Sequence, residues 1–268
     1  VARLEREVAG LAGQPFPVER RSGVVAEEFF ERYYAGHSPV VIADALKAWP
    51  RLASWSPSYF KEHFGDVEVE VMTRRDSART PGDETEGRRT LVPFGAFCER
   101  VTASTSTNDF YLVANNRVTN RPALSGLLDD VRGPHEYLHA DRDARWTSMW
   151  FGPPGTLTPL HHDTSSVLFC QVFGKKRFLL FPAFELFLTH AMHDGVYSAI
   201  DPENPDAETF PELAEVRPLE VVLSPGEALF LPVGWWHQVR ALEVSISLGF
   251  TAFRWPNRFD WYYPGKVG

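Results

Sequence analysis

The residues with the clearest capacity for chemistry are two histidines and an aspartate. His161 and Asp163 stand two positions apart, so on an extended backbone both side chains leave the same face, whereas His162 points the other way. Two imidazoles and one carboxylate on one face of a metal are the ligands of non-heme iron(II) oxygenases. The His161–Asp163 pair alone does not establish an iron site, because His-x-Asp is common by chance and zinc hydrolases use the same residue types.

A third ligand must come from a distant segment. His237 follows Trp235 and Trp236, and its separation from His161 is long enough for an antiparallel barrel strand to return beside the first pair. His237 therefore completes the predicted metal site. We expect one tryptophan to pack at the barrel mouth and the other to brace His237. His190 and His193 form another pair, but they are predicted as surface residues of a helix-to-loop segment.

Short strands dominate the chain after residue 65. The patterns predict strands at 67–71, 109–113, 145–150, 167–173, 176–181, 219–223, 228–231 and 244–248. Turn residues at 174–175 and 224–227 close two hairpins. Many short, evenly spaced strands are typical of a barrel or a sandwich, so the predicted fold class is mainly β.

The first 65 residues are predicted to be helical. Apolar positions share one helical stripe over 1–11, and a second helix over 27–34 stops at Gly36. Ser56 is a natural N-cap for a third helix, with Pro57 at its first position and Gly65 at its end. We expect residues 1–65 to buttress a core at 66–268 within the same domain. The charged segment 74–90 is predicted to be a solvated insertion, with a substrate lid as the alternative.

Composition excludes several classes of protein. A net charge of −8 argues against binding nucleic acid, which requires clustered Lys and Arg. No apolar run is long enough for a membrane helix, and residues 1–13 do not resemble a signal peptide. The two cysteines, Cys98 and Cys170, are too few for a disulfide scaffold, which favours the cytoplasm. Acidic residues recur over 194–215; a solvated loop is favoured over a site for a basic substrate.

Several motifs occur in one order over nearly the whole chain. They are FFERYY at 29–34, SPVVI at 38–42, WSPSYF at 55–60, TPLHHD at 158–163, QVFGKKR at 171–177, NP at 204–205 and SPGEALFLPVGWWH at 224–237. In these motifs the sequence resembles the JmjC, or cupin-like, oxygenases, and most closely the branch of the hypoxia-inducible factor asparaginyl hydroxylase. The resemblance implies a double-stranded β-helix with helices packed outside it, together with iron(II), 2-oxoglutarate and dioxygen.

The resemblance also assigns site residues. It implies that His161, Asp163 and His237 bind iron and that Lys176 pairs with the distal carboxylate of 2-oxoglutarate. A buried ammonium requires a counter-charge, which a dicarboxylate supplies. Thr158 and Tyr111 match positions whose hydroxyls bond the same carboxylate, although Tyr111 could equally be a barrel-filling aromatic. Two neighbours of Lys176 are expected to be ordinary surface charges, namely Lys175 and Arg177.

Two positions depart from the pattern of the closest relatives. Val167 and Gly249 stand where that branch has asparagines that would touch the metal-proximal end of 2-oxoglutarate. We expect the small, polar face formed by Ser245, Ser247, Gly249 and Thr251 to leave room for a ligand; a solvent-facing strand face would have the same pattern. We also expect the absent amides to weaken binding of 2-oxoglutarate without preventing it.

The predicted function is oxidation of a C–H bond, with a protein or peptide side chain as the expected substrate and a small molecule as the alternative. No nucleic-acid or membrane partner is expected, and a homodimer is left open. Demethylation is the same chemistry at an N-methyl carbon, but no aromatic cage favours it. Two other interpretations remain: a non-catalytic metal-binding barrel, which Val167 and Gly249 keep open, and a metal-dependent isomerase or hydrolase, which has no evident need for Lys176.

Overall fold

The structure is a computed structural model, and it describes residues 17–49, 52–75, 88–113, 121–131, 136–139, 147–183, 185, 192–194, 196–211, 216–257 and 259. The predicted helix at 1–11, most of the insertion at 74–90 and His190 lie outside these residues. None of the helices in the described part is long and apolar enough to cross a membrane.

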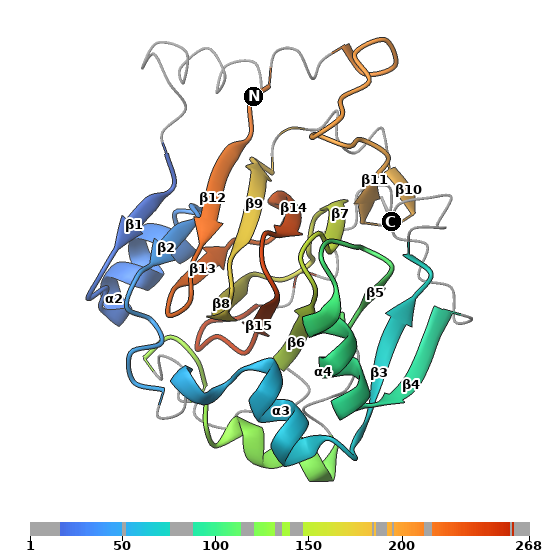
Figure 1. The fold of residues 1–268 in the computed structure, drawn as a ribbon. Coiled ribbons are helices and arrows are strands. Elements are labelled where there is room, and N and C mark those ends of the chain that lie inside the picture. Colours follow the sequence, from blue (N-terminus) through green and yellow to red (C-terminus); the bar gives the residue numbers. More distant parts are fainter. Residues whose placement is uncertain are drawn as a thin grey trace.

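Two six-stranded sheets form the barrel (Figure 1). The first has the order β1 (Glu19–Arg21), β2 (Val40–Ile42), β13 (Ala228–Leu231), β8 (Val167–Phe173), β15 (Ser245–Phe250) and β6 (Thr147–Gly152). The second has the order β10 (Met192–Asp194), β11 (Tyr197–Ser198), β7 (Leu157–His161), β14 (Trp236–Ala241), β9 (Lys176–Phe181) and β12 (Leu219–Leu223). Strands that follow one another along the chain, such as β8 and β9 or β13 and β14, alternate between the sheets. This alternation is the double-stranded β-helix, and it confirms the predicted fold class.

The barrel interior holds an apolar core built from both sheets. Phe169 and Leu229 from the first sheet pack with Phe178 and Leu180 from the second. Gly174 turns β8 into β9 with a φ of 64°, a backbone conformation that side-chain-bearing residues rarely adopt. A Cβ at this position would also lie 1.9 Å from the carbonyl oxygen of Val244, so the turn requires glycine.

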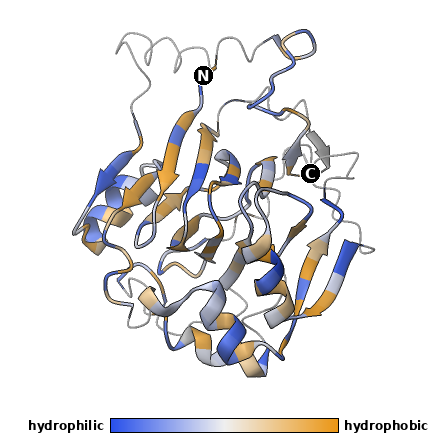
Figure 2. Ribbon diagram, in the orientation of Figure 1, coloured by the Kyte–Doolittle hydropathy of each residue, from blue (hydrophilic) through white to orange (hydrophobic). Residues whose placement is uncertain are grey.

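A third sheet and two helices cover the outer face of the first sheet. The sheet has the order β4 (Arg89–Pro93), β3 (Glu68–Thr73) and β5 (Phe110–Tyr111), and the helices are α3 (Pro57–Phe64) and α4 (Phe94–Ala103). Phe97 of α4 meets Phe151 of β6 at a ring-centroid distance of 5.2 Å, and Phe60 of α3 meets Phe94 at 5.1 Å. Figure 2 shows hydrophobic residues distributed along these sheets and helices. The packing of these aromatic rings holds the third sheet, which contains β5, against β6 of the first sheet.

The N-terminal part combines predicted helices with strands that were not predicted. The helices are α2 (Ala26–Glu28), continued by the π-helical η1 (Phe29–Tyr34), and α3, with a 3-10 turn at η2 (Leu52–Ser54). A second 3-10 segment, η6 (Pro122–Leu128), lies later in the chain, between β5 and β6. The α3 prediction is confirmed, because the Ser56 side chain accepts a hydrogen bond from the Tyr59 amide at 3.2 Å. However, β1 and β2 join the first sheet, with β2 pairing to β13. A short apolar run such as 40–42 has no periodicity that reveals a strand.

Further elements differ from the sequence interpretation. The α4 helix and strand β4 were not predicted, and β10 stands where a helix-to-loop segment around His193 was expected. The division at residue 65 remains a prediction, although pairing of β2 with β13 is what a buttress within the same domain requires.

Candidate metal centre

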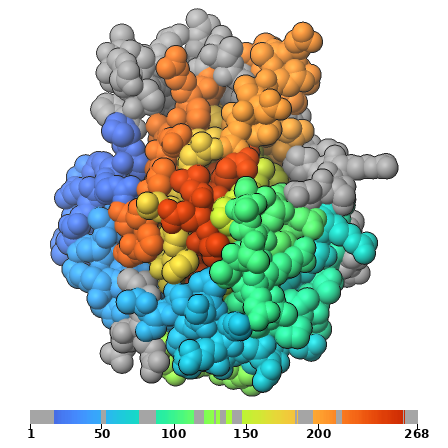
Figure 3. All heavy atoms as spheres, viewed as in Figure 1, coloured from blue at the N-terminus to red at the C-terminus, as the bar shows by residue number. Residues whose placement is uncertain are grey.

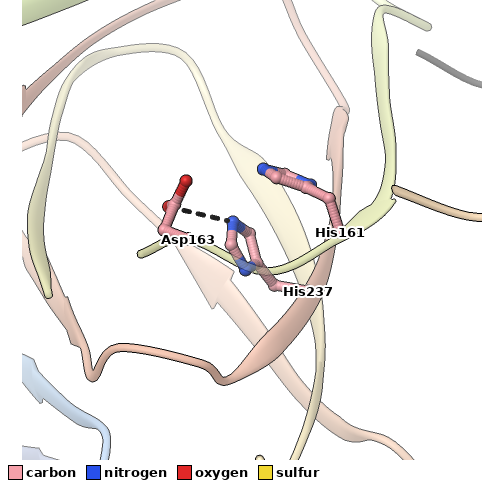
Figure 4. Close-up of side chains that lie close together, drawn as sticks. All are labelled: His161, Asp163 and His237. Carbon is pink, nitrogen blue, oxygen red and sulfur yellow. Dashed lines mark ion pairs between the residues drawn. The ribbon is translucent and has the colours of Figure 1, made fainter. Parts of the chain in front are cut away.

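One strand ladder brings the three predicted metal ligands together. His161, the last residue of β7, is the register partner of His237 on β14, and their ring centroids lie 4.0 Å apart. Asp163 follows β7, and its Oδ2 lies 3.7 Å from Nε2 of His237 (Figure 4). One potential ligand atom from each of the three residues lies within 4.8 Å of the other two. The two-residue spacing and the returning strand thus meet as predicted.

Backbone hydrogen bonds fix how the two histidines can bind a metal. Nδ1 of His161 lies 2.8 Å from the Pro159 carbonyl oxygen, and Nδ1 of His237 lies 3.0 Å from that of Trp235. A carbonyl oxygen only accepts, so each Nδ1 donates, and in the neutral ring this tautomer leaves the lone pair on Nε2. Such a bond to the second ring nitrogen is how proteins orient metal-binding imidazoles.

Burial differs across the three ligands. His237 is 5% exposed, and burial lowers its pKa well below the usual range, so its imidazole is neutral, the form that binds a metal. The Asp163 side chain is 40% exposed. The site is therefore closed behind His237 and accessible beside Asp163. In the space-filling view of the Figure 1 face, the late, red-coloured strands reach the surface between green and orange segments (Figure 3).

His162 and the two tryptophans lie behind the metal site. His162 is buried on the opposite face of the strand, as predicted, and its ring meets Trp236 edge-on at 4.7 Å. Trp236 packs in an apolar cluster outside the barrel, whereas Trp235 joins the interior core and donates its indole N–H to the His37 carbonyl oxygen at 3.1 Å. Trp235 also supplies the carbonyl that orients His237, so it is the bracing residue.

The barrel contains a buried cation beside a hydroxyl cluster. Lys176, the first residue of β9, is 1% exposed and donates from Nζ to the Tyr111 hydroxyl at 3.0 Å. No carboxylate of the described residues lies within 4 Å of this ammonium, and burial lowers the pKa of Lys176 to about 7. Burial raises the pKa of Tyr111, an effect opposed by the Arg75 charge and by a hydrogen bond with the Thr158 side chain. Lys176, Tyr111 and Thr158 therefore meet.

The indole of Trp150, which was not predicted as a site residue, lies beside this cluster and forms an aromatic wall. The face of β15 that carries Ser247 and Gly249 is buried inside the barrel, and Ser247 Oγ donates to Gln171 Oε1 at 2.8 Å. A Cβ at Gly249 would lie 2.7 Å from the Trp150 indole and 3.4 Å from Val167. The expectation that Gly249 leaves room is wrong, because Trp150 fills the space. The signal was the 145–150 strand itself, whose alternation places Trp150 on the inner face.

Arg177 was also misjudged, and two acidic residues at the start of an otherwise exposed segment have partners. Arg177 is not an ordinary surface charge, because it forms an ion pair with Glu203, whose carboxylate also takes Arg240. Asp201 accepts a hydrogen bond from Gln238 at 3.0 Å. These contacts hold the start of the predicted solvated loop against β9 and β14. The Lys175 prediction is confirmed, since Lys175 pairs with Glu243 at the surface at 3.6 Å.

Comparison with protein families gives an independent result. A model described as "Cupin-like domain" matches residues 26–252, which span the barrel and both predicted ligand segments. The chain belongs to the cupin-like domain family.

Cupin-like relatives of this chain include proteins with named activities. The chain is 32% identical to "Lysine-specific demethylase JMJ30" of Arabidopsis thaliana, over 87% of this chain and 54% of the relative. It is 30% identical to "Lysine-specific demethylase 8" of Xenopus tropicalis, over 84% and 50%. It is 26% identical to the human "Bifunctional peptidase and (3S)-lysyl hydroxylase JMJD7", over 83% and 79%. The chain spans about half the length of the first two relatives.

A solved structure supports the fold. The X-ray structure of E. coli ycfD matches with a TM-score of 0.50 at 18% identity, covering 88% of this chain and 55% of that one. At this identity the likeness concerns the fold alone, and it agrees with the two-sheet barrel.

Proposed function

We propose that this cupin-like chain is an iron(II)- and 2-oxoglutarate-dependent oxygenase that oxidises a C–H bond of a protein or peptide side chain. One observation carries the proposal: the metal triad shares one barrel with a buried Lys176, which has no carboxylate within 4 Å among the described residues. A triad alone is compatible with other metal chemistry, but burial disfavours the charged form of Lys176, and an anionic ligand would restore it.

The donor set of the centre fits iron(II). His161 and His237 offer Nε2 lone pairs, and Asp163 adds a carboxylate, which is the two-histidine, one-carboxylate arrangement. When bound, iron with 2-oxoglutarate supplies the activation of dioxygen and the oxidation of a C–H bond, with release of succinate and carbon dioxide. The protein fixes the ligands through the Pro159 and Trp235 carbonyls, which prevents the imidazoles from rotating away.

Lys176, Tyr111 and Thr158, here called the Lys176 pocket, would hold the distal end of the cosubstrate. The Lys176 ammonium would pair with the distal carboxylate of 2-oxoglutarate, and the Tyr111 and Thr158 hydroxyls would donate to it. Of the two interpretations of Tyr111, its hydrogen bond with Lys176 favours the polar one. Apolar burial around Lys176 strengthens the charge pair, because water does not screen it.

The substrate is inferred from the names of relatives. Two are named as lysine-specific demethylases and one as a lysyl hydroxylase, which supports a protein or peptide substrate for this chain. Hydroxylation is our proposal for the reaction, and demethylation is the alternative that these names favour. Membership of the asparaginyl hydroxylase branch, a cytoplasmic location and a homodimer remain predictions.

A non-catalytic metal-binding barrel is the second candidate. Two features favour it: Val167 has no amide, and the ring of Trp150 lies against Gly249, so neither position offers an amide to the metal-proximal end of the ligand. An isomerase or hydrolase is less favoured, because neither requires a buried cation such as Lys176.

The deciding experiment is titration of 2-oxoglutarate into the anaerobic iron(II) protein, followed by the metal-to-ligand charge-transfer absorbance. An oxygenase should show a saturable band and, in air, should form succinate. The matched control is the Lys176→Ala protein, which should load iron but require far more 2-oxoglutarate. No band at any concentration would leave the non-catalytic barrel as the better interpretation. Mass spectrometry of cell-extract proteins should then find a product heavier than its substrate by one oxygen atom, or lighter by one CH2 unit for each N-methyl group that is removed.

A further inference from the structure

The space above Gly249 is occupied by an aromatic ring. An added Cβ would lie 2.7 Å from Cζ3 and 2.8 Å from Cη2 of Trp150, closer than Cβ atoms come to other atoms. Trp150 is on β6, and β6 is the register neighbour of β15, with Trp150 opposite Ser247. The indole therefore crosses over the neighbouring strand, and the residue there must lack a side chain.

Trp150 also touches both walls that flank the buried cation. Its ring centroid lies 5.1 Å from that of Phe169, and it packs against the cluster that contains Tyr111. The Lys176 ammonium lies 5.2 Å from the Phe169 ring centroid and 5.5 Å from that of Tyr111. Trp150 is therefore continuous with the lining of the Lys176 pocket on one side and with Gly249 and Val167 on the other.

We propose that Trp150 is a positioning residue for the anionic ligand of the Lys176 pocket and that Gly249 is required to seat it. This inference rests on the proposed function. A flat ring along the wall gives the aliphatic part of a dicarboxylate an apolar surface and keeps water from Lys176. Shape and apolar burial would thus take the place of the hydrogen bond that an amide at position 167 or 249 would give to the ligand.

Packing between the two residues is tested without any ligand. In the metal-free protein, Gly249→Ala should lower the midpoint of thermal unfolding by about 5 °C, because the new methyl group overpacks the indole. In a Trp150→Leu background the same change should cost little, since the ring atoms that it meets are gone. If Gly249→Ala costs as much in both backgrounds, the packing between the pair is refuted.

The role in binding is tested by 2-oxoglutarate titration of the anaerobic iron(II) protein. Trp150→Leu should raise the dissociation constant for 2-oxoglutarate about tenfold and leave that for iron(II) unchanged; Trp150→Phe, which keeps a ring, should lie between. The matched control is Trp255→Leu, at a tryptophan that is 42% exposed and stacks on Phe30 outside the barrel, and it should bind like the unaltered protein.

The outcomes separate the two proposals. If the unaltered protein binds 2-oxoglutarate and both Trp150 variants bind it equally well, the inference fails and the proposed function stands. If the unaltered protein shows no charge-transfer band although it holds iron, the proposed function fails, and the Trp150 role falls with it.

Discussion

The metal centre and the Lys176 pocket are built in different ways. Two of the metal ligands face each other across one ladder, β7 with β14, and the third follows two positions later. The pocket draws Tyr111 from β5, Trp150 from β6, Lys176 from β9 and Gly249 from β15, strands that belong to three sheets.

This difference separates what local geometry fixes from what tertiary packing fixes. The metal ligands keep their positions as long as one strand pair keeps its register. The pocket needs the third sheet to hold Tyr111 and the first sheet to hold Trp150. Replacing a metal ligand should therefore abolish iron(II) binding, whereas replacing a pocket residue should weaken 2-oxoglutarate binding to an extent that depends on the residue.

The largest effect is expected at the metal ligands. His161→Ala, Asp163→Ala or His237→Ala should abolish iron(II) binding, because three donors are the minimum of this site. The matched control is His162→Ala, at the adjacent histidine that points away, which should keep iron near one equivalent when the folded protein is measured by metal analysis. Loss of iron only in the His162 variant would overturn the ligand assignment.

The next effect in size is expected at the buried cation. Lys176→Ala should weaken 2-oxoglutarate binding by at least about 100-fold, since loss of one partner of a buried charge pair costs about 3–5 kcal/mol. Lys175→Ala changes an exposed neighbour and should leave binding unaltered. Calorimetry of the anaerobic iron protein measures both. If Lys175 matters instead, the pocket is not built around Lys176.

The pH dependence should reveal the same cation. Lys176 has a pKa of about 7 in the ligand-free protein because of burial, and a bound dicarboxylate requires the protonated form. The 2-oxoglutarate affinity should therefore fall about tenfold per pH unit above about 7, until it approaches that of Lys176→Ala. In the ligand-free protein, by contrast, the free energy of unfolding should rise with pH above about 7.

The lowered pKa of Lys176 also makes the stability of the ligand-free protein depend on pH. In the unfolded chain the lysine keeps its proton up to about its ordinary value of 10.5, whereas the folded state releases it near 7. The unfolded state thus binds more protons in between, so the free energy of unfolding rises with pH across this window. Lys176→Met should flatten that rise in denaturation measured at several pH values, and an unchanged slope would contradict the lowered pKa.

The sequence was informative where local pattern decides. The same-face spacing of His161 and Asp163 needed only the strand period, and the N-cap at Ser56 only its neighbours. It was uninformative for contacts across sheets. A glycine on an inner face looks like empty space until the side chain opposite is known, and Trp150 filled it. Arg177 looked like a turn charge because its partner, Glu203, lies in a distant segment.

The smallest effect is expected at Val167, four residues after Asp163 at the start of β8. The asparagine-bearing branch has an amide here, and one hydrogen bond contributes about 1 kcal/mol, so Val167→Asn should tighten 2-oxoglutarate binding about fivefold. Trp150 limits the gain, because the indole and Val167 border the same point above Gly249. Val167→Leu is the matched control, since leucine has nearly the shape of asparagine without its amide. Anaerobic titration should show tightening for asparagine only. Tightening by both variants would mean that side-chain shape acts. Tightening by neither would mean that an amide at position 167 does not reach the ligand, whose binding would then depend on Lys176, its hydroxyl partners and Trp150.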